Sequence, residues 1–166
     1  MSTKTMENLF HDTLKDIYYA EKKIVKALPK MAKAAQSGEL ANAFETHRQE
    51  SEIHIERLEK IFETLGKSPQ GKTCPAIDGI IEEGEEIMKD YEDSPALDAG
   101  LIAAAQAVEH YEIARYGTLK CWAELMGMDE AADLLDETLQ EEAGTDEKLT
   151  ELADSSANEK ALSEAA

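Results

Sequence analysis

The sequence predicts an all-α protein, built as a bundle of four long helices. Three observations support this prediction. Apolar residues recur every three or four positions along four long segments, which is the spacing of one helix face. Aromatic residues make up only 5% of the chain, while Ala, Glu and Leu, which favour helix, are abundant. No segment alternates apolar and polar residues for long enough to indicate a β-strand.

The first two helices are expected to form an antiparallel hairpin. The first should run over about residues 3–36 and the second over about residues 39–65. Gly38 is predicted to be the left-handed cap of the first helix, and Gly66 is expected to stop the second. Because only two or three residues link the helices, they must fold back on each other.

A long connection, residues 67–94, separates the second helix from the third and is expected to hold a short helix at about 75–91. Ser94 as N-cap and Pro95 in the first turn predict the start of the third helix. Gly127 is expected to end it, and Asp129 to cap the fourth helix, which should reach about residue 154. Two helical hairpins joined by one long crossover are the topology of a ferritin-like four-helix bundle.

The length and composition of the chain indicate how many domains it forms, which classes of partner it excludes and in which cellular compartment it is expected. The chain of 166 residues is expected to form one domain over residues 1–154, followed by a flexible C-terminal tail, 155–166. A formal net charge of −19 argues against nucleic acid and anionic membranes as partners. The N-terminus lacks a signal-peptide core, no apolar run could span a bilayer, and Cys74 and Cys121 have no metal-ligand spacing. A cytoplasmic protein with reduced thiols is therefore predicted.

Each of the four apolar stripes is interrupted near its middle by acidic or histidine side chains. In chain order the interrupting residues are Glu21; His47, Glu50 and His54; Glu109 and Glu112; and Glu142 and Asp146. A carboxylate that faces a core is costly unless its charge is compensated, and the stripes contain no Lys or Arg. The pattern predicts a bound metal cluster, with solvated side chains at the stripe edges as the alternative.

The expected ligands follow the arrangement of di-iron bundles, in which two helices give one Glu each and two give a Glu–His pair. The predicted metal ligands are Glu21 and Glu109 as single carboxylates, Glu50 with His54 and Glu142 with Asp146 as i, i+4 pairs, and Glu112 as an extra carboxylate. Two divalent ions are predicted, and iron is favoured over manganese, although Asp146 in place of an imidazole keeps manganese plausible. His47 is interpreted as a hydrogen-bond partner of a ligand, with ligation as the alternative, and His110 as a surface or subunit contact.

Several stretches resemble the YciF branch of the YciE/YciF family of bacterial stress-response proteins, which is ferritin-like. The stretches that carry the resemblance are residues 17–23, 47–58, 79–83, 101–106, 108–114 and 135–149. The resemblance covers about residues 5–153. It implies a four-helix bundle with an additional short helix, usually a homodimer, and a di-metal site. It implies no known reaction, because the activity of the family is poorly defined.

The first functional hypothesis is a di-metal stress protein whose iron or manganese reacts with peroxide or oxygen at the bundle centre. An external reductant would be needed, because the chain has no Cys-rich electron-donor motif. The alternative is a structural or interaction bundle whose metal site is only structural or empty. Iron storage ranks last, because the sequence does not indicate the large hollow assembly that storage requires. Whether the protein is an enzyme stays open.

Overall fold

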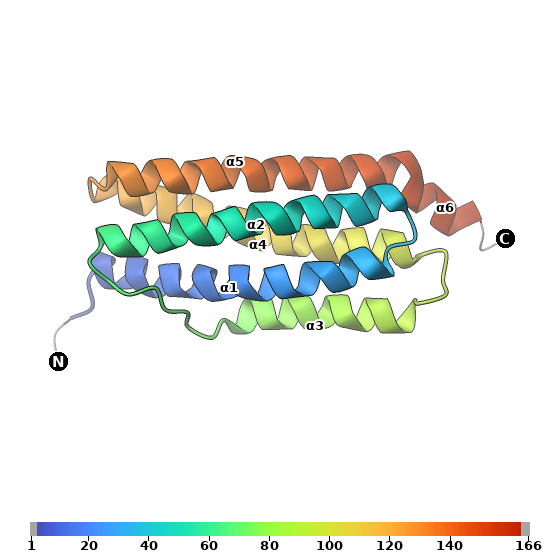
Figure 1. The fold of residues 1–166 in the computed structure, drawn as a ribbon, viewed down its shortest axis with the longest axis horizontal. Coiled ribbons are helices and arrows are strands. Elements are labelled where there is room, and N and C mark those ends of the chain that lie inside the picture. The colour runs from blue at the N-terminus through green and yellow to red at the C-terminus, as the bar shows by residue number, and fades with distance from the viewer. Residues whose placement is uncertain (1–2, 164–166) are drawn as a thin grey trace.

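The computed structural model describes residues 3–163, and this part of the chain is helical and contains no strand. In chain order the elements are α1 (Met6–Ala34), α2 (Gly38–Thr64), α3 (Pro75–Asp90), α4 (Leu97–Leu125), α5 (Asp129–Leu152), a π-helical turn η1 (Ala153–Ala157) and α6 (Asn158–Ser163). The four long helices lie side by side, and α3 packs against α1 and α4 (Figure 1). The predicted all-α, ferritin-like bundle with an extra short helix is confirmed.

The long crossover follows from the directions of the helices. The α1–α2 and α4–α5 pairs are antiparallel hairpins, but α2 ends at the left of Figure 1 whereas α4 begins at the right. The chain therefore has to return along the full length of the bundle before the second hairpin can start. Helix α3 covers most of that distance and buries Ile77 and Gly84 against its neighbours.

The ends of the first hairpin are set by different residues from those predicted. Gly38 is the first residue of α2 and not a left-handed cap, so that prediction is wrong. Helix α1 ends instead at Ala35, whose extended backbone (φ −55°, ψ 133°) needs no glycine. The serine before Gly38 is the N-cap of α2, and its side chain accepts a hydrogen bond from the backbone N–H of Leu40. Gly66 does have a positive φ, 64°, as a left-handed stop requires.

The second hairpin begins later than predicted. Helix α4 starts at Leu97, because Ser94 Oγ accepts a hydrogen bond from the backbone N–H of Ala96 (3.1 Å) and closes a turn before the helix. Asp129 is the first residue of α5 rather than its cap, which is Met128. Gly127, predicted to end the third helix, directly follows the C-cap of α4 and has a φ of 69°.

The C-terminal segment predicted to be a flexible tail is helical over residues 155–163, in η1 and α6, and Ala157 is buried in it. Residues 164–166 of that tail lie outside the described part of the chain. The domain boundary at residue 154 stays a prediction.

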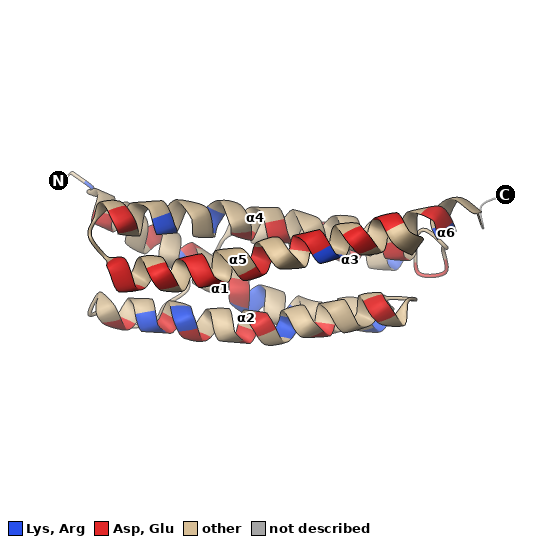
Figure 2. Cartoon of the chain, turned by 90° about the horizontal axis from the view of Figure 1, so that it is seen from above, with Lys and Arg blue, Asp and Glu red and all other residues tan. Residues whose placement is uncertain are grey.

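The acidic surplus lies mainly on solvent-facing sides of the helices. Acidic residues recur along the whole of α5 (Figure 2), and the side chains of Glu137 and Glu147 among them are exposed. Within residues 3–163, no helix combines the length and the hydrophobicity that a bilayer span needs.

A buried carboxylate ties the two hairpins together at one end of the bundle. Asp98, in the first turn of α4, is only 3% exposed. Its Oδ1 accepts a hydrogen bond from the backbone N–H of Gln36 (2.7 Å), and its Oδ2 accepts one from that of Ser37 (2.8 Å). Both donors lie in the turn between α1 and α2, so Asp98 satisfies backbone groups that no helix pairs.

Replacement of Asp98 should therefore destabilise the fold. Asp98→Ala leaves two buried N–H groups without acceptors, and we expect a loss of about 2–4 kcal/mol in the free energy of unfolding. Urea denaturation followed by circular dichroism measures this loss. The matched control is Asp129→Ala, an exposed aspartate in the first turn of α5. Equal effects of the two substitutions would contradict the assigned role of Asp98.

Candidate metal centre

Six ionisable side chains from four helices meet in the middle of the bundle, and each is at most 2% exposed. This central cluster consists of Glu21 from α1, His47 and His54 from α2, Glu109 and Glu112 from α4, and Glu142 from α5. It contains two groups whose ligand atoms lie within 4.8 Å of one another: His47, Glu109, Glu112 and Glu142, and Glu21, His54 and Glu142. Glu142 belongs to both groups, so a single carboxylate joins them.

The two oxygens of Glu142 face different histidines. Oε1 lies 2.9 Å from His54 Nδ1, and Oε2 lies 3.5 Å from His47 Nε2. The other ring nitrogen of His47, Nδ1, lies 2.9 Å from Glu109 Oε1, and His54 Nδ1 also lies 3.2 Å from Glu21 Oε1. With one oxygen toward each group, Glu142 would be the ligand that both groups share if metal were bound.

These short contacts do not have the geometry of hydrogen bonds. Both oxygens of Glu109, Glu112 and Glu142 lack a hydrogen-bond partner. The same is true of Nε2 of His47 and Nδ1 of His54. The side chains therefore converge on shared points rather than on one another. Buried polar groups are normally paired, so this convergence fits residues that hold metal ions.

No buried Lys or Arg in the described part of the chain offsets the charge of the carboxylates in the cluster. Among residues 3–163, the buried polar and charged side chains include no Lys or Arg. Four carboxylates carry four negative charges when they are ionised, and two divalent ions would neutralise them while both histidines stay neutral. Carboxylate oxygens with one imidazole in each group suit iron or manganese. The residues present therefore fit a two-metal site.

Without metal, bound protons neutralise the carboxylates of the cluster. Burial and the neighbouring carboxylates raise the pKa of Glu109 and of Glu112 well above the ordinary range. Burial opposes the charged form of His54, but Glu142 and Glu21 outweigh it and raise its pKa to about 10. The pKa of His47 is likewise well above its usual value, because Glu109 and Glu142 outweigh burial. The pKa of Glu142 is lowered despite burial, because the two nearby histidines favour its charged form.

Residues around the cluster fix the orientation of its members. His54 Nε2 lies 2.8 Å from Glu141 Oε2, and Arg57 donates two hydrogen bonds to the same carboxylate, at 2.6 and 2.9 Å. A proton on Nε2, donated to Glu141, leaves the lone pair of Nδ1 directed into the cluster. Tyr116 donates a hydrogen bond of 2.5 Å to Glu21 Oε1, the oxygen that lies 3.2 Å from His54 Nδ1.

The structure brings together five of the seven predicted ligands and leaves Glu50 and Asp146 outside both groups. Glu50 is half-buried at the edge of α2 and accepts a hydrogen bond from Thr145 Oγ1 (3.3 Å). Asp146 Oδ2 lies 3.2 Å from His110 Nε2, and its Oδ1 accepts a hydrogen bond from Gln106. The ligand role predicted for these two residues has no support in this geometry.

The structure differs from the prediction on α2 because Glu50 does not point into the bundle. At 100° per residue, position 51 lies about 40° from His47 around the helix, and position 50 lies about 60° away on the other side. The inward residue is accordingly Ser51, which is fully buried, and not Glu50. His47 and His54, two turns apart, both point inward. Their i, i+7 spacing is the signal that could have placed His47 among the ligands.

The fold and this cluster define a ferritin-like bundle protein with a candidate two-metal site. Residues 5–162 match a family described as a domain of unknown function, DUF892, and the chain belongs to that family. It is 45% identical to the protein YciF of Escherichia coli strain K12, over 99% of this chain and 100% of that protein. The predicted membership of the YciF branch is confirmed.

Solved structures show the same fold. The crystal structure of the E. coli stress protein YciF has a TM-score of 0.89 and 45% identity, over 94% of this chain and 99% of that chain. YcfI of Rhodopseudomonas palustris has a TM-score of 0.86 and 48% identity, over 89% and 94% of the two chains. A protein of Xanthomonas campestris shares the fold at 24% identity, with a TM-score of 0.71 over 91% and 92%.

The metal-free protein should lose stability as the pH rises. A group whose pKa is higher in the folded than in the unfolded protein stabilises the fold. This stabilisation is complete at a pH below the unfolded-state pKa and is lost as the pH rises through the folded-state pKa. For His54 this window runs from 6.5 to about 10. Glu109 and Glu112 likewise lose their stabilising effect as the pH rises above their ordinary pKa of 4.5. The lowered pKa of Glu142 has the opposite effect and favours the folded state at any pH above its ordinary pKa. We expect the melting temperature to fall by about 5 °C or more between pH 6.5 and 9.5.

Differential scanning calorimetry after chelation and dialysis measures this shift. The control is the same protein with Mn²⁺ added, because metal-bound ligands are already deprotonated and the curve should flatten. A melting temperature that rises over this pH range in the metal-free protein would contradict the assigned protonation of the cluster.

The contact between Glu141 and His54 predicts a change in metal affinity. Glu141→Gln removes the charge that orients His54 and should weaken Mn²⁺ binding by about 10–100-fold without loss of helix content. Isothermal titration calorimetry measures the affinity. Glu147→Gln, an exposed change on the same helix, is the matched control. Equal affinities of the two variants would show that Glu141 does not position the histidine.

Proposed function

We propose that this protein holds two iron or manganese ions at the central cluster and serves a redox reaction with peroxide or dioxygen. One observation carries the proposal. Glu142 belongs to both ligand groups, with one oxygen toward His54 and the other toward His47, and neither of these oxygens has a hydrogen-bond partner. The proposed ligands are Glu21, His47, His54, Glu109, Glu112 and Glu142. When bound, such a metal pair supplies the electrons for reduction of the oxidant.

The residues of this chain hold and insulate the site. The Glu141–Arg57 pair orients His54, and the hydroxyl of Tyr116 offers a proton 2.5 Å from Glu21. Fully buried apolar side chains lie on both sides of the cluster along the bundle, such as Ile17 on one side and Leu101 on the other, and limit its contact with water. This environment strengthens electrostatic interactions at the site and limits side reactions.

The biological setting is part of the proposal. A role in the bacterial stress response is supported by the 45% identity to YciF, which is described as a stress protein. We propose a cytoplasmic homodimer that takes its electrons from an external reductant.

The complete burial of the cluster favours a second candidate, in which the metal only stabilises the bundle. Each of the six side chains is at most 2% exposed, as expected for a structural site. In that case metal would raise the melting temperature, while consumption of both oxidants would stay at the background rate.

Oxidant consumption separates the two functions. Protein loaded anaerobically with Fe²⁺ should consume peroxide or dioxygen faster than the same iron free in buffer, as followed by an oxygen electrode and a peroxide assay. Glu142→Gln removes the shared carboxylate and should reduce this rate to background while helix content survives. Glu147→Gln is the control and should behave as the unmodified protein. Background rates in iron-loaded unmodified protein would refute the redox proposal.

A further inference from the structure

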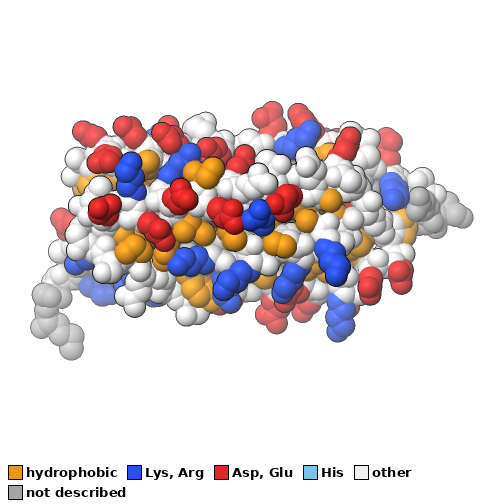
Figure 3. All heavy atoms as spheres, viewed as in Figure 1, with side chains coloured by type: hydrophobic (Ala, Val, Ile, Leu, Met, Phe, Trp, Pro, Cys, Tyr) orange, Lys and Arg blue, Asp and Glu red, His pale blue; other side chains and the backbone are white. Residues whose placement is uncertain are grey.

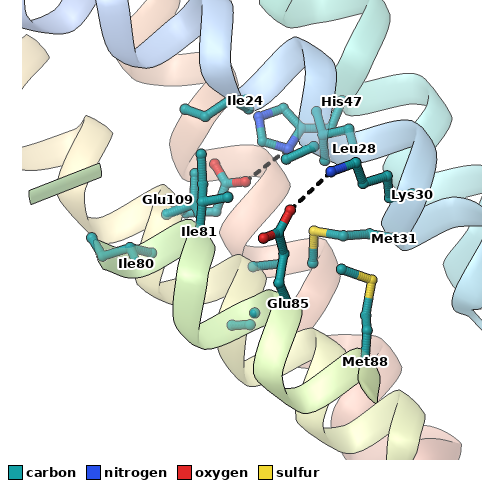
Figure 4. A pocket seen from close by; sticks show the side chains of 15 residues that line it. Ile24, Leu28, Lys30, Met31, His47, Ile80, Ile81, Glu85, Met88 and Glu109 are labelled. Atoms are coloured by element: carbon teal, nitrogen blue, oxygen red, sulfur yellow. Dashed lines mark hydrogen bonds and ion pairs between the residues drawn. The ribbon is translucent and has the colours of Figure 1, made fainter. Parts of the chain in front are cut away.

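A narrow apolar pocket lies between α1, α3 and α4 and ends at the central cluster. Figure 4 shows its walls, with Ile24 and Leu28 of α1 facing Ile81 and Met88 of α3. Small residues of α4, including Ala104, complete the lining. The extra helix α3 thus forms one wall of a pocket that reaches the proposed metal site.

The two ends of the pocket are polar and its middle is not. At the outer end Lys30 of α1 and Glu85 of α3 form an ion pair of 2.8 Å, with side chains that are 62% and 49% exposed (Figure 4). On the face of the molecule drawn in Figure 3, acidic and basic side chains lie among exposed apolar ones. At the inner end lie His47 and Glu109, which belong to the cluster. A neutral molecule that passes the ion pair therefore meets only apolar side chains until it reaches the cluster.

The size and polarity of the pocket select its occupant. The cavity measures about 20 Å³, above the roughly 10–15 Å³ that a single water molecule needs, so it has room for one small molecule. A water molecule needs two to four polar partners, and the apolar middle of the pocket offers none, whereas apolar cavities stay dry and take up apolar molecules such as xenon. Dioxygen is small, neutral and apolar. Peroxide would lose its hydrogen bonds with water on entry, which is costly.

A separate polar groove reaches the cluster from the opposite side of α2. It lies between α2 and α5, has a volume of about 370 Å³ and is lined by residues that include Glu50, Thr145 and His47. Polar species such as metal ions and peroxide have this route available. The two approaches to His47 therefore differ in polarity.

We propose that the apolar pocket under α3 is a binding and transit site for dioxygen on its way to the central cluster. The chemistry at the end of the route rests on the proposed function, but the binding site itself does not. The occupancy of the pocket can accordingly be tested in protein that contains no metal.

Xenon is the probe for the pocket. Metal-free protein pressurised with xenon should show one bound atom between Ile81 and Val108, by anomalous diffraction or by xenon NMR. A Cβ atom on Gly84 would lie 3.6 Å from the Ala104 Cβ, so Gly84→Leu directs a side chain into the pocket. It should weaken xenon binding by about tenfold or more.

Two further variants keep the result interpretable. Ala27→Leu fills the pocket from the α1 wall and should also displace xenon if Gly84→Leu fails to fold. Gly79→Leu is the matched control, because Gly79 is exposed on the same helix and has no neighbour within 4 Å of an added Cβ. Absence of xenon from the unmodified protein, or unchanged binding in both filled variants, would overturn the proposal.

Oxidant selectivity tests the transit role. In iron-loaded protein, the filled variants should slow consumption of dioxygen by about tenfold and leave consumption of peroxide within about twofold of the unmodified protein. Unchanged dioxygen rates in filled variants would overturn the route and leave the redox function intact. If xenon binds but neither oxidant is consumed by the unmodified protein, the proposed function fails and the binding site stands.

Discussion

The burial of four carboxylates and two imidazoles at one level of the bundle is the constraint on which the rest of the structure depends. An isolated charge in a protein core is expensive, and no buried Lys or Arg within residues 3–163 offsets these carboxylates. Neutrality must come from metal ions or from protons. Raised pKa values of Glu109 and Glu112 show the second solution, and the convergence of unpartnered oxygens fits the first.

The bundle around the cluster supplies ligands from every long helix. One residue comes from α1, two come from each of α2 and α4, and one comes from α5. The hairpin turns and the Asp98 contact set the relative heights of the helices, since a shift of one residue along any helix would turn its ligands away. The fold therefore controls the site through helix register, and the cost of the buried charges is offset by the packing of the surrounding core.

Much of the fold and part of the site could be predicted from the sequence. The apolar stripes fixed the number and order of the long helices, and the long crossover predicted the ferritin-like topology. Helix ends were less predictable, because Ser94 can cap a helix or close a turn, and here it closes a turn. In the same way a three-four spacing does not distinguish Glu50 from Ser51 as the inward residue. The choice depends on how α2 is rotated about its axis.

Access to the cluster comes from two sides. Helix α3, which a plain bundle lacks, forms one wall of the apolar pocket, and the α2–α5 groove offers a polar approach. With two such approaches, ions can reach the site without crossing the apolar pocket, and a neutral gas can reach it without crossing the polar groove. In this view the crossover helix serves the site as well as the connection between the two hairpins.

The most direct test of the central claim is the metal content of the cluster. Chelator-treated protein would be titrated anaerobically with Fe²⁺ or Mn²⁺, and the bound metal counted by elemental analysis after gel filtration. The account predicts about two ions per chain, as in the two-metal bundle class. Protein that keeps its helices and binds neither ion would contradict it, because the buried carboxylates would then be neutralised by protons alone.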